Sequence, residues 1–313
     1  MEKDFASECW FLTGPTAAGK TAVGIELARR IDAEIVSLDS MAIYRGMDIG
    51  TAKPTAAERQ AVPHHLIDIV WPDEEFSLAQ YLEAAKAAVA EIRGRAKEVL
   101  FVGGTPLYLK GLLRGIFQGP PADWRFRAQM AEEAERRGSG WLYQQLAAVD
   151  PDAARQLHPH DTRRLIRALE VYRKTGRPIS RWQTQFAAGR PAESCRVFGL
   201  DWPRAALHMR IDRRVEQMFA EGLVEEVRRL LEGPAPLGKT ARQAVGYREV
   251  IEYLEGRYDL GETIERVKCH TRQLARRQYT WFRSLSECRF IRVREPIDEV
   301  DVAERIARAG RRD

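Results

Sequence analysis

Gly14-Pro-Thr-Ala-Ala-Gly-Lys-Thr21 is the stretch that decides the fold, because it matches the phosphate-loop pattern GxxxxGK[ST]. The apolar run Cys9-Trp-Phe-Leu-Thr13 precedes it, and residues 22–31 follow it with Val23 and Leu27 at helical spacing. A strand, a glycine-rich loop and a helix in this order are the context that the pattern requires. In such a loop the backbone N–H groups and the helix N-terminus converge on phosphate oxygens. The stretch therefore predicts a polyphosphate ligand without specifying a nucleotide.

Two more strand-like runs extend this beginning into a sheet. Residues 33–38 are mostly apolar and end at Asp39, and residues 99–102 are apolar and end at Gly103-Gly104. Between the two runs, Ser77 starts a capping box, the Ser-x-x-Gln pattern that opens a helix. Strands that alternate with helices in this way pair in parallel. The sequence predicts an α/β fold, with a P-loop NTPase-like parallel sheet core flanked by helices.

The middle of the chain interrupts this core. After a break at Gly119-Pro-Pro121, residues 124–185 are helical in character and contain no strand-like run. Strand character returns at residues 197–200, the chain is then helical to about Ser284, and residues 289–293 are a candidate last strand. We expect an α/β core made of residues 1–118 and 192–313, with an all-helical insertion at residues 119–191.

Composition and charge limit the class of protein. The 313 residues are 44% hydrophobic and 30% charged, which excludes a mainly disordered chain. No apolar run approaches the ~18 residues of a membrane span, and the start lacks a signal-peptide core, so we expect a cytoplasmic protein without membrane contact. The four cysteines are far apart, which predicts neither disulfides nor a zinc site. A formal charge of +5 favours an anionic partner.

Single side chains at the predicted sheet edge are candidates for chemistry. Lys20 adds a positive charge to the loop, and the Thr21 hydroxyl is a candidate Mg²⁺ ligand. Asp39 ends the second run, at the edge where open α/β sheets bind ligands, and could be a magnesium ligand, a general base or a helix N-cap. The third run ends in Gly103-Gly104-Thr105, without the acidic residue of many P-loop ATPases. This turn allows a ligand to approach the backbone closely, or is simply tight.

Two predicted helices carry rows of basic residues. The segment from Arg155 to Arg181 contains eight Lys or Arg and two acidic residues, and its helix has a predicted N-cap at Asp161 and a predicted stop at Gly176. An aromatic ring among arginines suits RNA, through phosphate contacts and base stacking, whereas a solvated charged face is the alternative. The second row follows the helical spacing i, i+4, i+7 and i+11 and consists of Arg272, Arg276, Tyr279 and Arg283.

Longer blocks of sequence are more specific than these motifs. The most specific is Asp39-Ser-Met-Ala-Ile-Tyr-Arg-Gly-Met-Asp-Ile-Gly-Thr-Ala-Lys-Pro54. Together with the P-loop, these blocks resemble, in order, those of the tRNA dimethylallyltransferases (tRNA isopentenyltransferases). The resemblance spans almost the whole chain and is least at the ends of the insertion and after Ser284. The further blocks are Pro63-His-His-Leu-Ile-Asp68, Val102-Gly-Gly-Thr-Pro-Leu-Tyr108, Ala244-Val-Gly-Tyr-Arg-Glu249 and Thr271-Arg-Gln-Leu-Ala-Arg-Arg-Gln-Tyr-Thr-Trp-Phe-Arg283.

The resemblance implies a reaction. A dimethylallyl group would move from dimethylallyl diphosphate to N6 of the adenosine on the 3′ side of the anticodon, in tRNAs that read codons beginning with U. Asp39 would accept the N6 proton, and Lys20 and Thr105 would complete the catalytic group. Mg²⁺, held by Thr21 together with the donor, would help to stabilise the departing diphosphate. The expected diphosphate-binding residues are Gly14, Pro15, Thr16, Ala17, Ala18, Gly19, Lys20, Thr21 and Arg214.

The resemblance also implies a tRNA partner whose target base is flipped out of the anticodon loop. The helical insertion would bind the anticodon stem-loop, and we expect the protein to act as a monomer. The expected tRNA-binding residues are Asp39, Ser40, Met41, Ala42, Thr105, Arg127, Arg163, Arg164, Leu165, Ile166, Arg167, Gln243, Ala244, Val245, Gly246, Tyr247, Arg248, Arg276, Arg277, Gln278, Tyr279, Thr280, Trp281, Phe282 and Arg283.

Two other classes of function compete with this interpretation. A small-molecule P-loop kinase would use Lys20 and Mg²⁺ on ATP and Asp39 as the base for an alcohol, and it predicts nucleotide hydrolysis and a small lid rather than a basic helical insertion. A non-catalytic RNA-binding P-loop protein predicts RNA binding that survives changes at Asp39 and shows no turnover.

Overall fold

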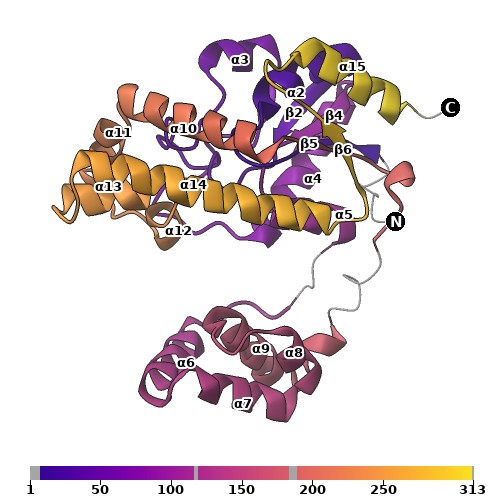
Figure 1. Ribbon diagram of the computed structural model, residues 1–313. Coiled ribbons are helices and arrows are strands. Elements are labelled where there is room, and N and C mark those ends of the chain that lie inside the picture. The colour runs from indigo at the N-terminus through magenta and orange to yellow at the C-terminus, as the bar shows by residue number, and fades with distance from the viewer. Residues whose placement is uncertain (1–7, 116–118, 183–188, 312–313) are drawn as a thin grey trace. The chain divides into compact units, whose positions relative to one another are not determined.

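A computed structural model describes residues 8–115, 119–182 and 189–311 (Figure 1). The chain divides into two compact units, one made of Met1–Leu113 and Gly189–Asp313 and the other of Arg114–Ala188. The second unit corresponds to the expected insertion, but it begins and ends a few residues before the expected bounds of 119 and 191. The expected helical residues 183–185 lie outside the described ranges. No helix in the described ranges is long and apolar enough to cross a membrane.

The core of the first unit is one parallel sheet, which confirms the predicted fold class. Its strand order is β3-β2-β4-β1-β5-β6. The first strand therefore lies at the centre of the sheet, and the loop that follows it opens beside the end of β4. The strands are β1 (Trp10–Thr13), β2 (Ala33–Ser37), β3 (His64–His65), β4 (Glu98–Val102), β5 (Arg196–Asp201) and β6 (Cys288–Arg292).

Helices pack against this sheet, and further helices of the same unit lie to one side of it (Figure 1). One buried cluster packs α2, α10 and α15 around Trp10, Phe198 and Leu200, and another joins α11 and α13 around Tyr44 and Tyr247. The predicted capping box at Ser77 is confirmed, because its hydroxyl accepts a hydrogen bond from the Gln80 N–H. The helices are α2 (Lys20–Ile31), α3 (Ala56–Ala61), α4 (Leu78–Gly94), α5 (Pro106–Arg114), α10 (Arg204–Ala220), α11 (Leu223–Leu231), α12 (Lys239–Arg242), α13 (Tyr247–Leu254), α14 (Leu260–Arg283) and α15 (Glu299–Gly310).

The second unit contains helices and no strand among its described residues, and it has its own apolar core. Leu142, Leu146 and Leu165 are fully buried there. The predicted limits of its basic helix are confirmed, since Asp161 caps the first turn and Gly176 ends the helix at a φ of 69°. Its elements are α6 (Trp124–Arg137), α7 (Ser139–Val149), α8 (Pro151–Gln156), α9 (Thr162–Thr175) and the short 3-10 helix η1 (Ile179–Arg181).

A buried carboxylate holds the loop that follows β2. Glu226 of α11 is 3% exposed and accepts hydrogen bonds from the N–H groups of Asp48 and Ile49 at 2.9 and 2.8 Å. It also accepts the Tyr247 hydroxyl at 2.6 Å and the Gly50 N–H at 3.2 Å. A buried carboxylate needs this many donors to replace its hydration. The Glu226 side chain therefore fixes the loop whose continuation lines the pocket described below.

Gly50 is the tightest point of this loop, and substituting it tests the packing. In Gly50→Ala the new Cβ would lie 2.4 Å from Cε2 of the fully buried Tyr247. We expect a loss of about 1–3 kcal/mol in the free energy of unfolding, measured by urea denaturation, because the ring cannot move aside without breaking the 2.6 Å hydrogen bond from its hydroxyl to Glu226. The control is Gly94→Ala at the end of α4, where no atom of the described residues lies within 4 Å of the new Cβ apart from the helix's own backbone and the chain neighbours. Equal stability of the two variants would contradict this account.

Candidate active site at the carboxyl edge of the sheet

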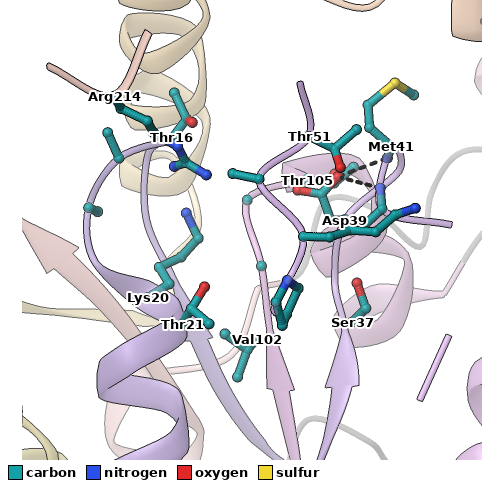
Figure 2. A pocket seen from close by; sticks show the side chains of 18 of the residues that line it. Thr16, Lys20, Thr21, Ser37, Asp39, Met41, Thr51, Val102, Thr105 and Arg214 are labelled. Carbon is teal, nitrogen blue, oxygen red and sulfur yellow. Dashed lines mark hydrogen bonds between the residues drawn. The ribbon is translucent and has the colours of Figure 1, made fainter. Parts of the chain in front are cut away.

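Three backbone segments meet where β1, β2 and β4 end. The Leu38 N–H donates to the Val102 carbonyl at 2.8 Å, and the Gly103 N–H donates to the Leu12 carbonyl at 3.1 Å. A Cβ on Gly103 would lie 2.2 Å from the Leu38 carbonyl oxygen, so only glycine fits. The segments border a pocket of about 780 Å³, whose lining includes residues 16–21 of the P-loop, Asp39 and Thr105 (Figure 2). The strand ends thus bring together the candidates that the sequence placed at this edge.

The P-loop has a backbone that requires glycine at two points. Gly14 and Gly19 have φ values of +143° and +83°, and α2 begins directly after Gly19. The Lys20 ammonium group donates to the carbonyl oxygens of Gly14 and Pro15, at 3.1 and 2.7 Å. Burial, and next the charge of Arg214, lower the pKa of Lys20 to about 8. The Thr21 hydroxyl reaches the same pocket one residue later.

Arg214 brings a second positive charge to this loop from α10. Figure 2 shows its guanidinium group and the Lys20 ammonium group pointing into the same space. Burial lowers the pKa of Arg214, and Asp39 acts in the opposite direction. Among the described residues, none forms a hydrogen bond or an ion pair with the Arg214 guanidinium. Two half-buried cations beside a helix N-terminus make this side of the pocket suitable for an anion.

Asp39 and Thr105 lie on the other side of the pocket. The Asp39 Oδ1 atom accepts hydrogen bonds from the N–H groups of Met41 at 2.8 Å and Ala42 at 3.3 Å (Figure 2). The Thr105 hydroxyl accepts the Ser40 N–H at 3.0 Å. Asp39 therefore caps a turn rather than a helix, and within the described chain its Oδ2 atom forms no hydrogen bond. That oxygen is the one available as a proton acceptor or a metal ligand.

The residues expected to contact RNA in the α14 block are not on one surface. The Gln278 side chain lines the main pocket, whereas Phe282 is fully buried. A second cavity of about 870 Å³ is lined by exposed or half-buried side chains of the basic stripe. There the Arg283 guanidinium lies 4.4 Å from the Tyr279 ring centre. The cavity lining includes Arg204, Arg276, Tyr279, Thr280, Arg283 and Arg292.

The block from Gln243 to Arg248 belongs to the first unit, as α14 does. Ala244, Val245 and Tyr247 line the main pocket, with the Tyr247 side chain fully buried. Arg248 pairs with the buried Glu249 at 2.5 Å and lies 3.0 Å from the His270 ring.

Within the insertion, the expected RNA contacts divide into exposed and buried positions. Arg163 and Arg164 are exposed, but Leu165 and Ile166 belong to the apolar core. Arg127 and Arg167 both pair with Glu170, which has no exposed side-chain surface. Burial alone would raise the pKa of Glu170, but hydrogen bonds from Arg127, the Asp123 N–H and Arg167 lower it to about 2. The Leu165 and Ile166 side chains therefore pack in the apolar core of the insertion and are not exposed for contact with RNA.

Sequence reasoning did not identify several residues that shape the main pocket. Arg210 donates to the Ala17 carbonyl at 2.9 Å and so supports the P-loop, and its spacing of four from Arg214 on a helix was the available signal. Lys53, whose side chain is 2% exposed, pairs with Asp48 and Asp68 at 2.6 and 2.5 Å and lines the pocket. Both Lys53 and Asp48 lie inside the long Asp39–Pro54 block.

Comparison with known proteins gives the family. The family model described as IPP transferase matches residues 42–285. A tRNA dimethylallyltransferase of Rhodopirellula baltica is 53% identical over 287 residues, which cover 89% of this chain and 86% of that protein. A tRNA dimethylallyltransferase of Geobacter metallireducens is 46% identical over 287 residues, covering 92% of this chain and 93% of that one.

A solved structure agrees with these matches. The crystal structure of the tRNA isopentenylpyrophosphate transferase of Bacillus halodurans has a TM-score of 0.69 to this chain at 36% identity, with 97% of each chain covered. The family resemblance noted in the sequence is thereby confirmed. The chain belongs to the IPP transferase family and is a transferase.

Proposed function

We propose that this transferase moves a dimethylallyl group from dimethylallyl diphosphate to N6 of the adenosine on the 3′ side of the anticodon, in tRNAs that read codons beginning with U, and releases diphosphate. One observation carries the proposal. A single pocket has two cations and a P-loop on one side and a carboxylate with a free oxygen on the other. A prenyl diphosphate and an amine need these two environments next to each other.

The anion side of the pocket suits the leaving group. When the C–O bond of the donor breaks, negative charge grows on the diphosphate. Lys20, Arg214 and the P-loop N–H groups can stabilise that charge, and the Lys20 ammonium group is already held at the loop by the Gly14 and Pro15 carbonyls. We assign diphosphate binding to Gly14, Pro15, Thr16, Ala17, Ala18, Gly19, Lys20, Thr21 and Arg214.

The carboxylate side suits the nucleophile. An adenine N6 lone pair is delocalised into the ring, so the amine gains nucleophilicity if its proton is removed during attack. In the proposed step N6 forms a bond to the allylic carbon, the C–O bond to diphosphate breaks, and the N6 proton passes to Asp39 Oδ2. Thr105 would contact the target base from the adjoining turn, where its hydroxyl already orders Ser40.

A magnesium ion fits this site only with the help of the donor. No cluster of three or more metal-binding side chains occurs within the described ranges, and the Thr21 hydroxyl lies in the pocket beside Lys20. Mg²⁺ is commonly held by one or two protein oxygens together with substrate phosphates. Thr21 would hold the ion against the diphosphate, where it would neutralise part of the leaving group's charge.

The RNA would be held by the basic surfaces. In this proposal the exposed arginines of α14 and those of the insertion, Arg163 and Arg164, contact the tRNA backbone. The Tyr279 ring beside Arg283 offers a surface for stacking an unpaired base. Location in the cytoplasm and action as a monomer are also part of the proposal, and light scattering of the purified protein measures the oligomeric state.

Asp39→Asn tests the base. Asparagine keeps an oxygen for the N–H groups of Met41 and Ala42 but cannot accept the N6 proton, so we expect the single-turnover rate to fall by ~10²–10⁴-fold with tRNA binding retained. The control is Asp259→Asn, which changes a carboxylate that caps α14 through the Glu262 N–H at 2.8 Å. A near-normal rate in Asp39→Asn would mean that Asp39 is not the base.

Arg276→Glu combined with Arg277→Glu tests the RNA surface. Both side chains are exposed on α14, so the fold should be unaffected. We expect weaker tRNA binding in filter or fluorescence assays, and a salt dependence whose slope drops by ~0.7–0.9 for each phosphate group that the protein no longer neutralises. Arg229→Glu combined with Arg311→Glu makes the same charge change at exposed arginines outside both cavities. Equal weakening in this control would point to net charge rather than to a surface.

The donor itself is tested by transfer of label. Radiolabelled dimethylallyl diphosphate should label an unmodified tRNA when Mg²⁺ is present and ATP is absent, because β4 ends without the acidic residue that γ-phosphate hydrolysis would need. Pyrophosphate should inhibit by occupying the same loop. An enzyme that requires ATP, releases ADP and leaves the tRNA unlabelled would be a kinase instead.

A further inference from the structure

One side chain joins the two halves of the main pocket. The Gln278 Oε1 atom accepts the Thr16 N–H of the P-loop at 2.9 Å, and its Nε2 atom donates to the Gly104 carbonyl at 2.7 Å. Both ends of the amide are therefore used, and both bonds run to backbone atoms. One bond reaches the loop assigned to the diphosphate, and the other reaches the turn that carries Thr105.

The glycine at position 104 leaves the space that this amide fills. A Cβ on Gly104 would lie 2.8 Å from Gln278 Nε2 and 3.4 Å from Lys20 Nζ. The turn and the amide are thus fitted to each other beside the Lys20 charge. The backbone of α14 ties this arrangement to Arg276 and Arg277, which are exposed on the same helix within two residues of Gln278.

We propose that Gln278 is a positioning residue that sets the distance between the P-loop and the Gly104-Thr105 turn, and hence between the donor diphosphate and the adenine that attacks it. The inference deepens the proposed function and rests on it for the identity of the two substrates. It differs from the RNA contact that the family resemblance implied for this residue. The transfer rate depends on this distance, because adenine N6 must approach the allylic carbon in line with the breaking C–O bond. A misplacement of ~1 Å can cost on the order of 100-fold in rate.

Gln278→Leu removes both hydrogen bonds from a side chain of similar bulk. We expect the single-turnover rate at saturating donor and tRNA to fall on the order of 100-fold, while the Kd for tRNA changes by less than about twofold. The matched control is Gln217→Leu on α10, whose exposed amide lies outside both cavities and donates to the Glu221 carboxylate at 2.8 Å. Its rate should equal that of the wild type. Circular dichroism melting of both variants checks that the fold is intact.

Gln278→Glu separates the two bonds. The carboxylate can still accept the Thr16 N–H, but it cannot donate to the Gly104 carbonyl and it adds a negative charge near the donor. We therefore expect Gln278→Glu to weaken pyrophosphate binding, measured by calorimetry without tRNA, on the order of tenfold more than Gln278→Leu does. This binding readout does not depend on transfer activity.

The outcomes distinguish this inference from the proposed function. A weaker tRNA Kd in Gln278→Leu with an unchanged rate at saturating tRNA would make Gln278 a direct RNA contact and overturn the inference. Unchanged rate and unchanged pyrophosphate binding in both variants would overturn it as well. If the wild-type protein transfers no prenyl group but its pyrophosphate binding responds to both substitutions as expected, the proposed function fails while the positioning of the P-loop by Gln278 is supported.

Discussion

Close approach of three backbone segments at the carboxyl edge of the sheet is the constraint on which the site depends. At Gly103 the chain passes so near the Leu38 carbonyl that a Cβ would lie 2.2 Å from its oxygen, and at Gly14 a Cβ would lie 3.3 Å from the Leu200 backbone. These backbone contacts bring the ends of β1, β2, β4 and β5 together, and the Thr105 and Gln278 side chains add hydrogen bonds between the loops that follow the strands. Lys20, Asp39 and Thr105 reach one pocket for this reason, although they come from separate parts of the chain.

The electrostatics of the pocket follow from this packing. Lys20 and Arg214 are half-buried in the same pocket, so burial lowers the pKa of both, and the charge of Arg214 lowers the pKa of Lys20 further. With a pKa of about 8, Lys20 keeps its proton below that pH and loses it above. An anion bound between the two cations would favour the charged form of each. Asp39 lies across the pocket, and its Oδ1 atom is occupied by the turn that it caps. Opposite charges are thus kept apart across one cavity.

Much of this arrangement could be predicted from the sequence, because it depends on local signals. The P-loop between a strand and a helix, the capping box at Ser77 and the cap at Asp161 are patterns of neighbouring residues, and all three are present. Strand β3 was not predicted because two residues carry no period. Helix α15 was also not predicted, although its N-cap residue Asp298 is a signal that the sequence contains. The roles of Glu226 and Gln278 could not be predicted, since their partners lie 176 and 262 residues away in sequence.

The central claim is that one pocket joins a prenyl diphosphate to an anticodon-loop adenosine. Nucleoside mass spectrometry of tRNA from a strain that lacks this gene, complemented with the wild type or with Asp39→Asn, tests it most directly. The account predicts that dimethylallyladenosine next to the anticodon is absent in the deletion strain, returns with the wild-type gene and stays absent with Asp39→Asn. The same nucleoside content in all three strains would contradict the claim.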